Sequence, residues 1–102
     1  MLKQAEKAAD RRALFAAVLA LDDAADCAAF FADLCTPAEL EALAGRWRVA
    51  RLLDRGMAYR EISRQTGIST ATVVRVARCL TYGGDGGYRR VLDRFKEKND
   101  GR

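Results

Sequence analysis

The sequence contains no histidine and only one proline in its 102 residues. Without histidine, the chain lacks the commonest general base and the usual partner of a catalytic serine or cysteine. No pair of carboxylates and no nucleophile beside a base stands out among the remaining residues. We therefore expect no catalytic residues and a protein that is not an enzyme.

Cysteine is also scarce, and its spacing is uninformative for chemistry. Cys27, Cys35 and Cys79 are odd in number and form no Cys-x-x-Cys pair, so neither a disulfide framework nor a zinc site is predicted. We expect no metal and no cofactor. Free, buried thiols in a reducing cytoplasm are the default expectation for such cysteines.

No segment alternates polar and apolar residues with the period of a strand. Alanine, arginine and leucine dominate, which predicts an all-α chain of about six helices. A lone Gly-rich stretch, Gly83 to Gly87, has neither a preceding strand nor a following Lys-Ser/Thr, so we interpret it as a flexible joint rather than a phosphate loop. The expected helices are 3–21, 26–34, one from Pro37 to near Gly56, two within about 57–80, and 88–98.

Charge and apolar residues are distributed unevenly along the chain. Residues 1–35 carry a net charge of −2 and residues 36–102 a net charge of +6. The basic part favours a polyanionic partner, although a merely solvated surface has the same composition. The first two helices have more apolar surface than a small domain needs, so they either wrap their own core or form a dimer interface. Acidic residues directly after Leu21 mark the segment from Arg11 as an amphipathic helix and not a secretory signal, and no membrane partner is expected.

The third helix has a well-specified beginning. Thr36 can cap it, Pro37 suits its first position, and Glu39 can complete a capping box. A stripe of five apolar residues is expected to face the core, with Trp47 inside it: Leu40, Leu43, Trp47, Ala50 and Leu53.

The stretch GMAYREISRQTGISTATVVRVARCL, Gly56 to Leu80, has the spacing of a helix-turn-helix. Ser63 is small where the helices approach, Gly67 suits a left-handed turn, and Ser69 is a natural cap for the second helix. The seam between the helices is expected to consist of Ile62, Ile68, Val73 and Val76.

If the second helix buries its valines, its opposite face is free for the major groove of DNA. On the first helix, arginine side chains are suitably placed for phosphates. The predicted DNA-binding residues are Tyr59, Arg60, Arg64, Ser69, Thr70, Ala71, Thr72, Arg75 and Arg78. A helical hairpin that binds only an acidic protein could share this pattern; steep salt dependence and sequence preference would distinguish DNA binding from it.

Two segments resemble the Trp-repressor-like family, and specifically its YerC/YecD branch. LCTPAELEALAGRWRVARLLDRG with REISRQTGISTATVVRVARCL resembles the repressor core from Leu34 to Leu80, and YGGDGGYRRVLDRF resembles the ending of that branch. Residues 1–33 match in helical character alone. The resemblance implies an intertwined, bacterial, cytoplasmic homodimer that regulates transcription, with a dimerisation arm at 1–35 and a DNA-binding core at 36–98.

The same resemblance bears on a small-molecule effector. Arg46 and Arg75 match the two arginines that frame the corepressor of the tryptophan repressor, while Val76 replaces a glycine and Cys79 a serine of that pocket. The added carbons of Val76 would clash with an indole, which predicts no response to tryptophan. An altered Arg46/Arg75 pocket for another small anion is the alternative.

Overall fold

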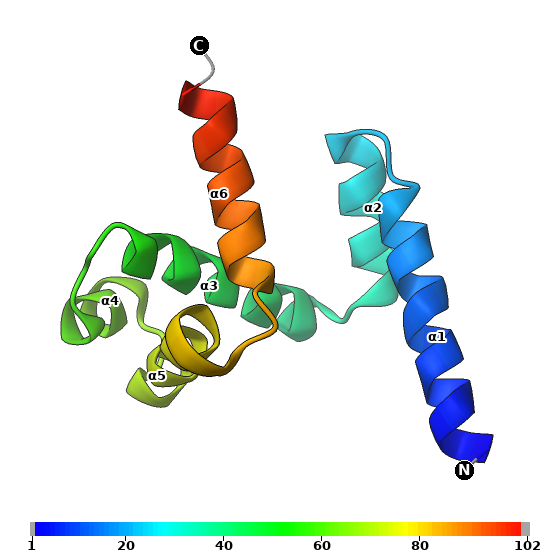
Figure 1. Cartoon of the computed structure of the whole chain (residues 1–102), viewed down its shortest axis with the longest axis horizontal. Coiled ribbons are helices and arrows are strands. Elements are labelled where there is room, and N and C mark those ends of the chain that lie inside the picture. The colour runs from blue at the N-terminus through cyan, green and yellow to red at the C-terminus, as the bar shows by residue number, and fades with distance from the viewer. Residues whose placement is uncertain (1, 101–102) are drawn as a thin grey trace. The chain divides into compact units, whose positions relative to one another are not determined.

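A computed structural model describes residues 2–100, and the side chains of residues 3–98 within them. This part of the chain contains helices and no strand, which confirms the all-α prediction (Figure 1). It divides into two compact units, one ending at Leu40 and the other beginning at Glu41. The helices are α1 (Leu2–Leu19), α2 (Ala24–Leu34), α3 (Pro37–Asp54), α4 (Tyr59–Thr66), α5 (Thr70–Arg78) and α6 (Gly87–Asp100), with a short π-helical segment, η1 (Cys79–Gly83), between the last two.

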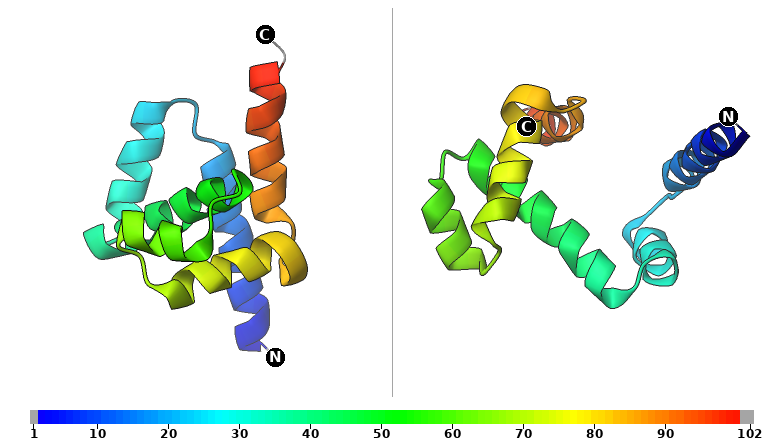
Figure 2. Two further views of the ribbon diagram at one scale, coloured as in Figure 1. Left: turned by 90° about the vertical axis from the view of Figure 1, so that its left-hand side faces the viewer. Right: turned by 90° about the horizontal axis from the view of Figure 1, so that it is seen from below.

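In the first unit, α1 and α2 run antiparallel (Figures 1 and 2). α1 ends two residues before the expected boundary, and Asp23 caps α2 by accepting a hydrogen bond from the backbone N–H of Asp26 at 2.8 Å. None of the described side chains from residue 3 to residue 40 is buried. The large apolar side chains that this unit leaves exposed are Leu14, Phe15, Val18, Leu19 and Leu34.

The expectation of buried thiols is wrong for this chain. Cys27 and Cys79 are exposed and Cys35 is half-buried. Cys27 lies on α2, a helix without any buried residue, and Cys79 lies where α5 ends and η1 begins, on the open side of the helix. All three cysteines are free.

The capping box of α3 forms as predicted. The backbone N–H of Thr36 donates to Oε1 of Glu39 at 2.8 Å, and the N–H of Glu39 donates to Oγ1 of Thr36 at 3.1 Å. These hydrogen bonds lower the pKa of Glu39. They satisfy two donors that a helix start otherwise leaves unpaired.

The buried core lies entirely in the second unit. Of the stripe predicted for α3, Ala50 is buried but Leu43 is 41% exposed, and the other buried residues of the helix are Val49 and Leu52. The predicted stripe is therefore confirmed for Ala50 and for Trp47 and Leu53, which pack half-buried against the core, and it is wrong for Leu43. The core consists of Val49, Ala50, Leu52, Ile62, Val73, Val76, Ala77 and Leu92.

α3 also contacts α6, which stands across it in Figure 1. Trp47 packs half-buried against Tyr88 and Phe95, with ring centroids 6.4 and 6.2 Å apart. Nearer the end of α3, Asp54 pairs with Arg89 at 2.9 Å and with Lys96 at 3.1 Å. Aromatic packing and ion pairs thus hold α6 to α3.

Gly84 in the glycine-rich segment before α6 is required by a close approach. A Cβ at Gly84 would lie 2.2 Å from the carbonyl oxygen of Cys79, and Gly86 has a positive φ of 84°. The backbone can make this turn because neither position carries a side chain. None of the helices in the described part of the chain is long and apolar enough to cross a membrane.

Candidate nucleic-acid interface

The turn between α4 and α5 is fixed by short, local hydrogen bonds. Gly67 adopts the predicted left-handed conformation, with φ 73°. The hydroxyl of Ser63 donates to the carbonyl oxygen of Ile68 at 2.7 Å, and the hydroxyl of Thr66 accepts from the N–H of Ile68 at 3.1 Å. Ser69 caps α5 by accepting from the N–H of Thr72 at 3.2 Å. Both predicted turn residues, Gly67 and Ser69, are therefore confirmed.

The predicted seam is also present. Ile62 and Val73 are fully buried, Val76 is 1% exposed, and Ile68 packs against them while partly exposed. Gly45 of α3, which the sequence pattern did not single out, lies against this seam. A Cβ there would come within 3.2 Å of Cδ1 of Ile68, so the absent side chain lets the turn lie close to α3.

The exposed face of α5 brings together most of the predicted groove residues. Thr70, Ala71, Arg75 and Arg78 are all exposed, opposite the buried valines. With Val74 and Cys79 they line one shallow hollow on the protein surface. Arginine, threonine and a small apolar side chain are the types that contact guanine edges, bases or phosphates and the thymine methyl group.

Two of the predicted DNA-binding residues, at the start of α5, make hydrogen bonds to each other. The hydroxyl of Ser69 donates to Oγ1 of Thr72 at 3.0 Å while accepting from its backbone N–H, and Thr72 is half-buried. These hydroxyls therefore hold the first turn of α5 in place. The N-terminus they shape carries the positive end of the helix dipole.

On α4, Tyr59 is 45% exposed and Arg60 is exposed, whereas Arg64 is engaged by a neighbour. Its Nε donates to Oε2 of Glu61 at 3.0 Å, and its Nη2 donates to Oε1 of the same carboxylate. Gln65 donates its amide to Oε1 of Glu61 at 3.0 Å. The hydrogen bonds from Arg64 and then Gln65 lower the pKa of Glu61 to about 2. Sequence reasoning did not include Glu61 in the site, although its spacing of three from Arg64 is a recognisable signal.

The four residues matched to the corepressor pocket lie in different environments. Arg75 and Cys79 line the hollow on α5, and Arg46 lies half-buried on α3, outside the set that lines this hollow. Val76 points into the core instead of toward the surface, since 1% of it is exposed.

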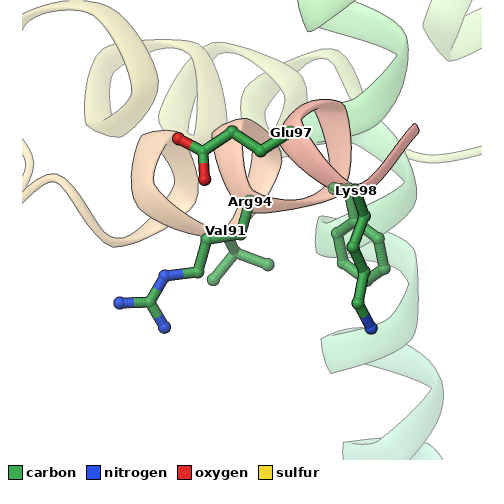
Figure 3. A pocket seen from close by; sticks show the side chains of 5 residues that line it. Val91, Arg94, Glu97 and Lys98 are labelled. Carbon is green, nitrogen blue, oxygen red and sulfur yellow. The ribbon is translucent and has the colours of Figure 1, made fainter. Parts of the chain in front are cut away.

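A separate hollow lies on α6 (Figure 3). Arg94 and Lys98 extend to the same side of the helix, with Val91 beside Arg94, whereas the carboxylate of Glu97 is directed elsewhere. Val91 is 43% and Phe95 56% exposed, so this side of α6 also leaves apolar surface uncovered.

A helix-turn-helix that exposes threonine and arginine on its second helix, opposite a buried seam, has the arrangement of DNA-binding helix-turn-helix proteins. The sequence matches the family model described as Trp repressor protein over residues 9–96. The chain therefore belongs to the Trp repressor family. Because the match begins at residue 9, the expectation that residues 1–33 share only helical character with the family is wrong for residues 9–33.

Relatives and solved structures support this membership. The uncharacterized protein YerC of Bacillus subtilis is 51% identical over 84 residues, which cover 82% of this chain and 80% of that protein. The structure of a TrpR-like protein from Eubacterium eligens has a TM-score of 0.78 at 42% identity and covers 83% of this chain and 87% of its own. A proposed Trp repressor from Staphylococcus aureus has a TM-score of 0.80 at 40% identity, covering 86% and 87%. These findings support a DNA-binding regulator of the Trp repressor type.

Proposed function

We propose that this protein is a non-catalytic transcriptional regulator of the cytoplasm that binds specific sequences of double-stranded DNA by placing α5 in the major groove. The exposed face of α5 is the observation that carries the proposal. Thr70, Ala71, Arg75 and Arg78 lie on it, while Val73 and Val76 anchor the opposite face in the core. A recognition helix needs this division between a buried and a polar face.

The contacts divide between bases and backbone. Arg75 and Arg78 are suited to guanine edges, and Thr70 and Ala71 to bases near the start of the helix. Arg60, Arg64 and Tyr59 of α4 are suited to phosphates, which position the protein without reading sequence. Ser69 and Thr72 hold the N-terminal turn of α5, whose dipole favours a phosphate.

The proposed active form is a homodimer in which residues 1–35 are the dimerisation arm and 36–98 the DNA-binding core. The uncovered apolar side chains of α1, such as Phe15 at 58% and Leu19 at 85% exposure, support this arrangement. A dimer would place its two recognition helices about 34 Å apart, one turn of DNA, and would favour an approximately palindromic site. Multi-angle light scattering should report twice the chain mass at micromolar concentration, whereas a monomeric mass would contradict the proposal.

Selection of bound duplexes from a random library tests the function directly. We expect enrichment of a palindromic motif with half-sites about one helical turn apart. If no sequence is enriched over the starting library and binding does not change with salt, the rival hypothesis of a protein-binding hairpin would be favoured.

A further inference from the structure

Glu61 is the single carboxylate between Gly56 and Leu80, a stretch that also contains four arginines. Its side chain is 39% exposed and that of Arg64 is 70% exposed, so their ion pair lies on the open surface of α4. Gln65 donates to the same carboxylate at 3.0 Å. The carboxylate therefore binds two of the polar side chains on the outer face of α4.

This geometry has two consequences for Arg64. Two of its nitrogens, Nε and Nη2, donate to Glu61, and Nη1 is left without a partner in this contact. The guanidinium is thereby oriented, with Nη1 free for a phosphate. The carboxylate also cancels the positive charge beside it, so a phosphate that approaches Arg64 approaches Glu61 as well.

We propose that Glu61 is a specificity-determining residue, which suppresses attachment to DNA of arbitrary sequence while it orients Arg64 for one phosphate at the correct site. This inference depends on the proposed DNA-binding function. Non-specific complexes depend almost wholly on phosphate neutralisation, so the cancelled charge weakens them. In the specific complex, the base contacts of α5 also fix the position of α4 on the DNA. The oriented guanidinium of Arg64 then makes a phosphate contact that offsets the affinity lost to the charge of Glu61.

Replacement of the charge alone tests the proposal. On random duplex, Glu61→Gln should steepen the salt slope, which is the change in the logarithm of the binding constant with the logarithm of salt concentration. We expect a change of about 0.9 for each helix-turn-helix, hence about 1.8 for a dimer. For one helix-turn-helix, this change in slope corresponds to about eightfold tighter binding of random duplex by Glu61→Gln than by the parent at 0.1 M salt. Binding to the selected duplex should rise less, so the ratio of specific to non-specific affinity falls.

Three matched variants separate charge from structure. Glu61→Asp keeps the charge and should keep the parent's salt slope on random duplex. The double variant Glu61→Gln/Arg64→Gln has the net charge of the parent and should return to its slope. Glu97→Gln removes an exposed carboxylate and should leave the slope unchanged, because Glu97 lies on α6 and not on α4 or α5 (Figure 3).

The outcomes distinguish the inference from the function on which it depends. If the parent binds the selected duplex specifically but Glu61→Gln binds both duplexes with unaltered slopes and ratio, the inference is wrong and the function stands. A change of melting temperature alone would likewise assign Glu61 a purely structural role and overturn the inference. If the parent binds no duplex in a saturable way, the proposed function fails, and the inference fails with it.

Discussion

The hydroxyl of Ser63 donates a hydrogen bond to the carbonyl oxygen of Ile68 at 2.7 Å, across the turn that joins α4 to α5. Ile68 lies just after the end of α4, and the hydroxyl gives its carbonyl oxygen a hydrogen-bond donor there. Ser63→Ala should lower the free energy of unfolding by about 1–2 kcal/mol, because a partly buried carbonyl loses its donor. Urea unfolding at fixed protein concentration measures the loss. Thr81→Ala, which removes an exposed hydroxyl, should change stability much less; equal losses would contradict this role of Ser63.

Asp54 should make stability depend on acid pH. Burial raises its pKa, but hydrogen bonds from Arg89 and Lys96 outweigh burial and lower the pKa below the ordinary value of 3.8. Its stabilising effect is therefore present above about pH 4 and is lost as the pH falls through the lowered value. Because the side chains of Arg89 and Lys96 are 42% and 56% exposed, we expect Asp54→Asn to cost about 1 kcal/mol at pH 7.

Thermal unfolding of Asp54→Asn and the parent at pH 7 and near pH 2 tests this linkage. The difference in melting temperature should shrink at the lower pH. Asp93→Asn is a suitable control, since its side chain is 50% exposed and bonds only to Arg89, at 3.2 Å. A pH-independent difference for Asp54→Asn would show that its ion pairs are not the cause.

Arginines on α5 and α4 should differ in what their loss does to DNA binding. Replacement of Arg75 or Arg78 by alanine should cost about 1–3 kcal/mol and relax preference at one base pair, if the side chain pairs with guanine. Arg60→Ala should weaken all sequences alike and lower the salt slope by about 1. Binding isotherms on the selected duplex and on single-base variants distinguish the two effects. Arg90→Ala, on α6, controls for net charge; losses equal to those of the α5 variants would refute the assignment.

Tryptophan should not bind or alter DNA affinity. Val76 stands where the resemblance implies a glycine, and its side chain is buried beside Ile62 and Val73 instead of leaving a gap for a ring. Titration calorimetry of the unmodified protein with L-tryptophan should therefore show no saturable heat. Micromolar binding that also tightens the complex with the selected duplex would show that the pocket survives. In that case, the alternative of an effector-dependent regulator would be favoured.

Features set by neighbouring residues were predictable from the sequence. The capping box of Thr36 and Glu39, the left-handed Gly67 and the cap at Ser69 each depend on contacts within a few positions, so their residue types carry the signal. The part of the apolar seam on α5 was predictable for the same reason, because Val73 and Val76 are three residues apart on one helix. The exposed face of α5 then follows as the side opposite the seam.

Features that join distant segments were not predictable in this way. Gly45 gains its role from Ile68, and Asp54 from Arg89 and Lys96, all far along the chain. The predicted stripe could not show that Leu43 stays exposed while Val49 and Leu52 are buried. The exposure of Cys27 was not predictable either, since nothing in its local sequence indicates that α2 lacks a buried face.

Fluorescence anisotropy with the selected duplex and a scrambled duplex of equal length and composition tests the central claim of sequence-specific DNA binding most directly. Titrations between about 50 and 200 mM salt should give affinities that fall steeply with salt on both duplexes. The selected duplex should be bound at least about 10³-fold more tightly at physiological salt. Equal affinities for the two duplexes, or binding that does not change with salt, would contradict the account.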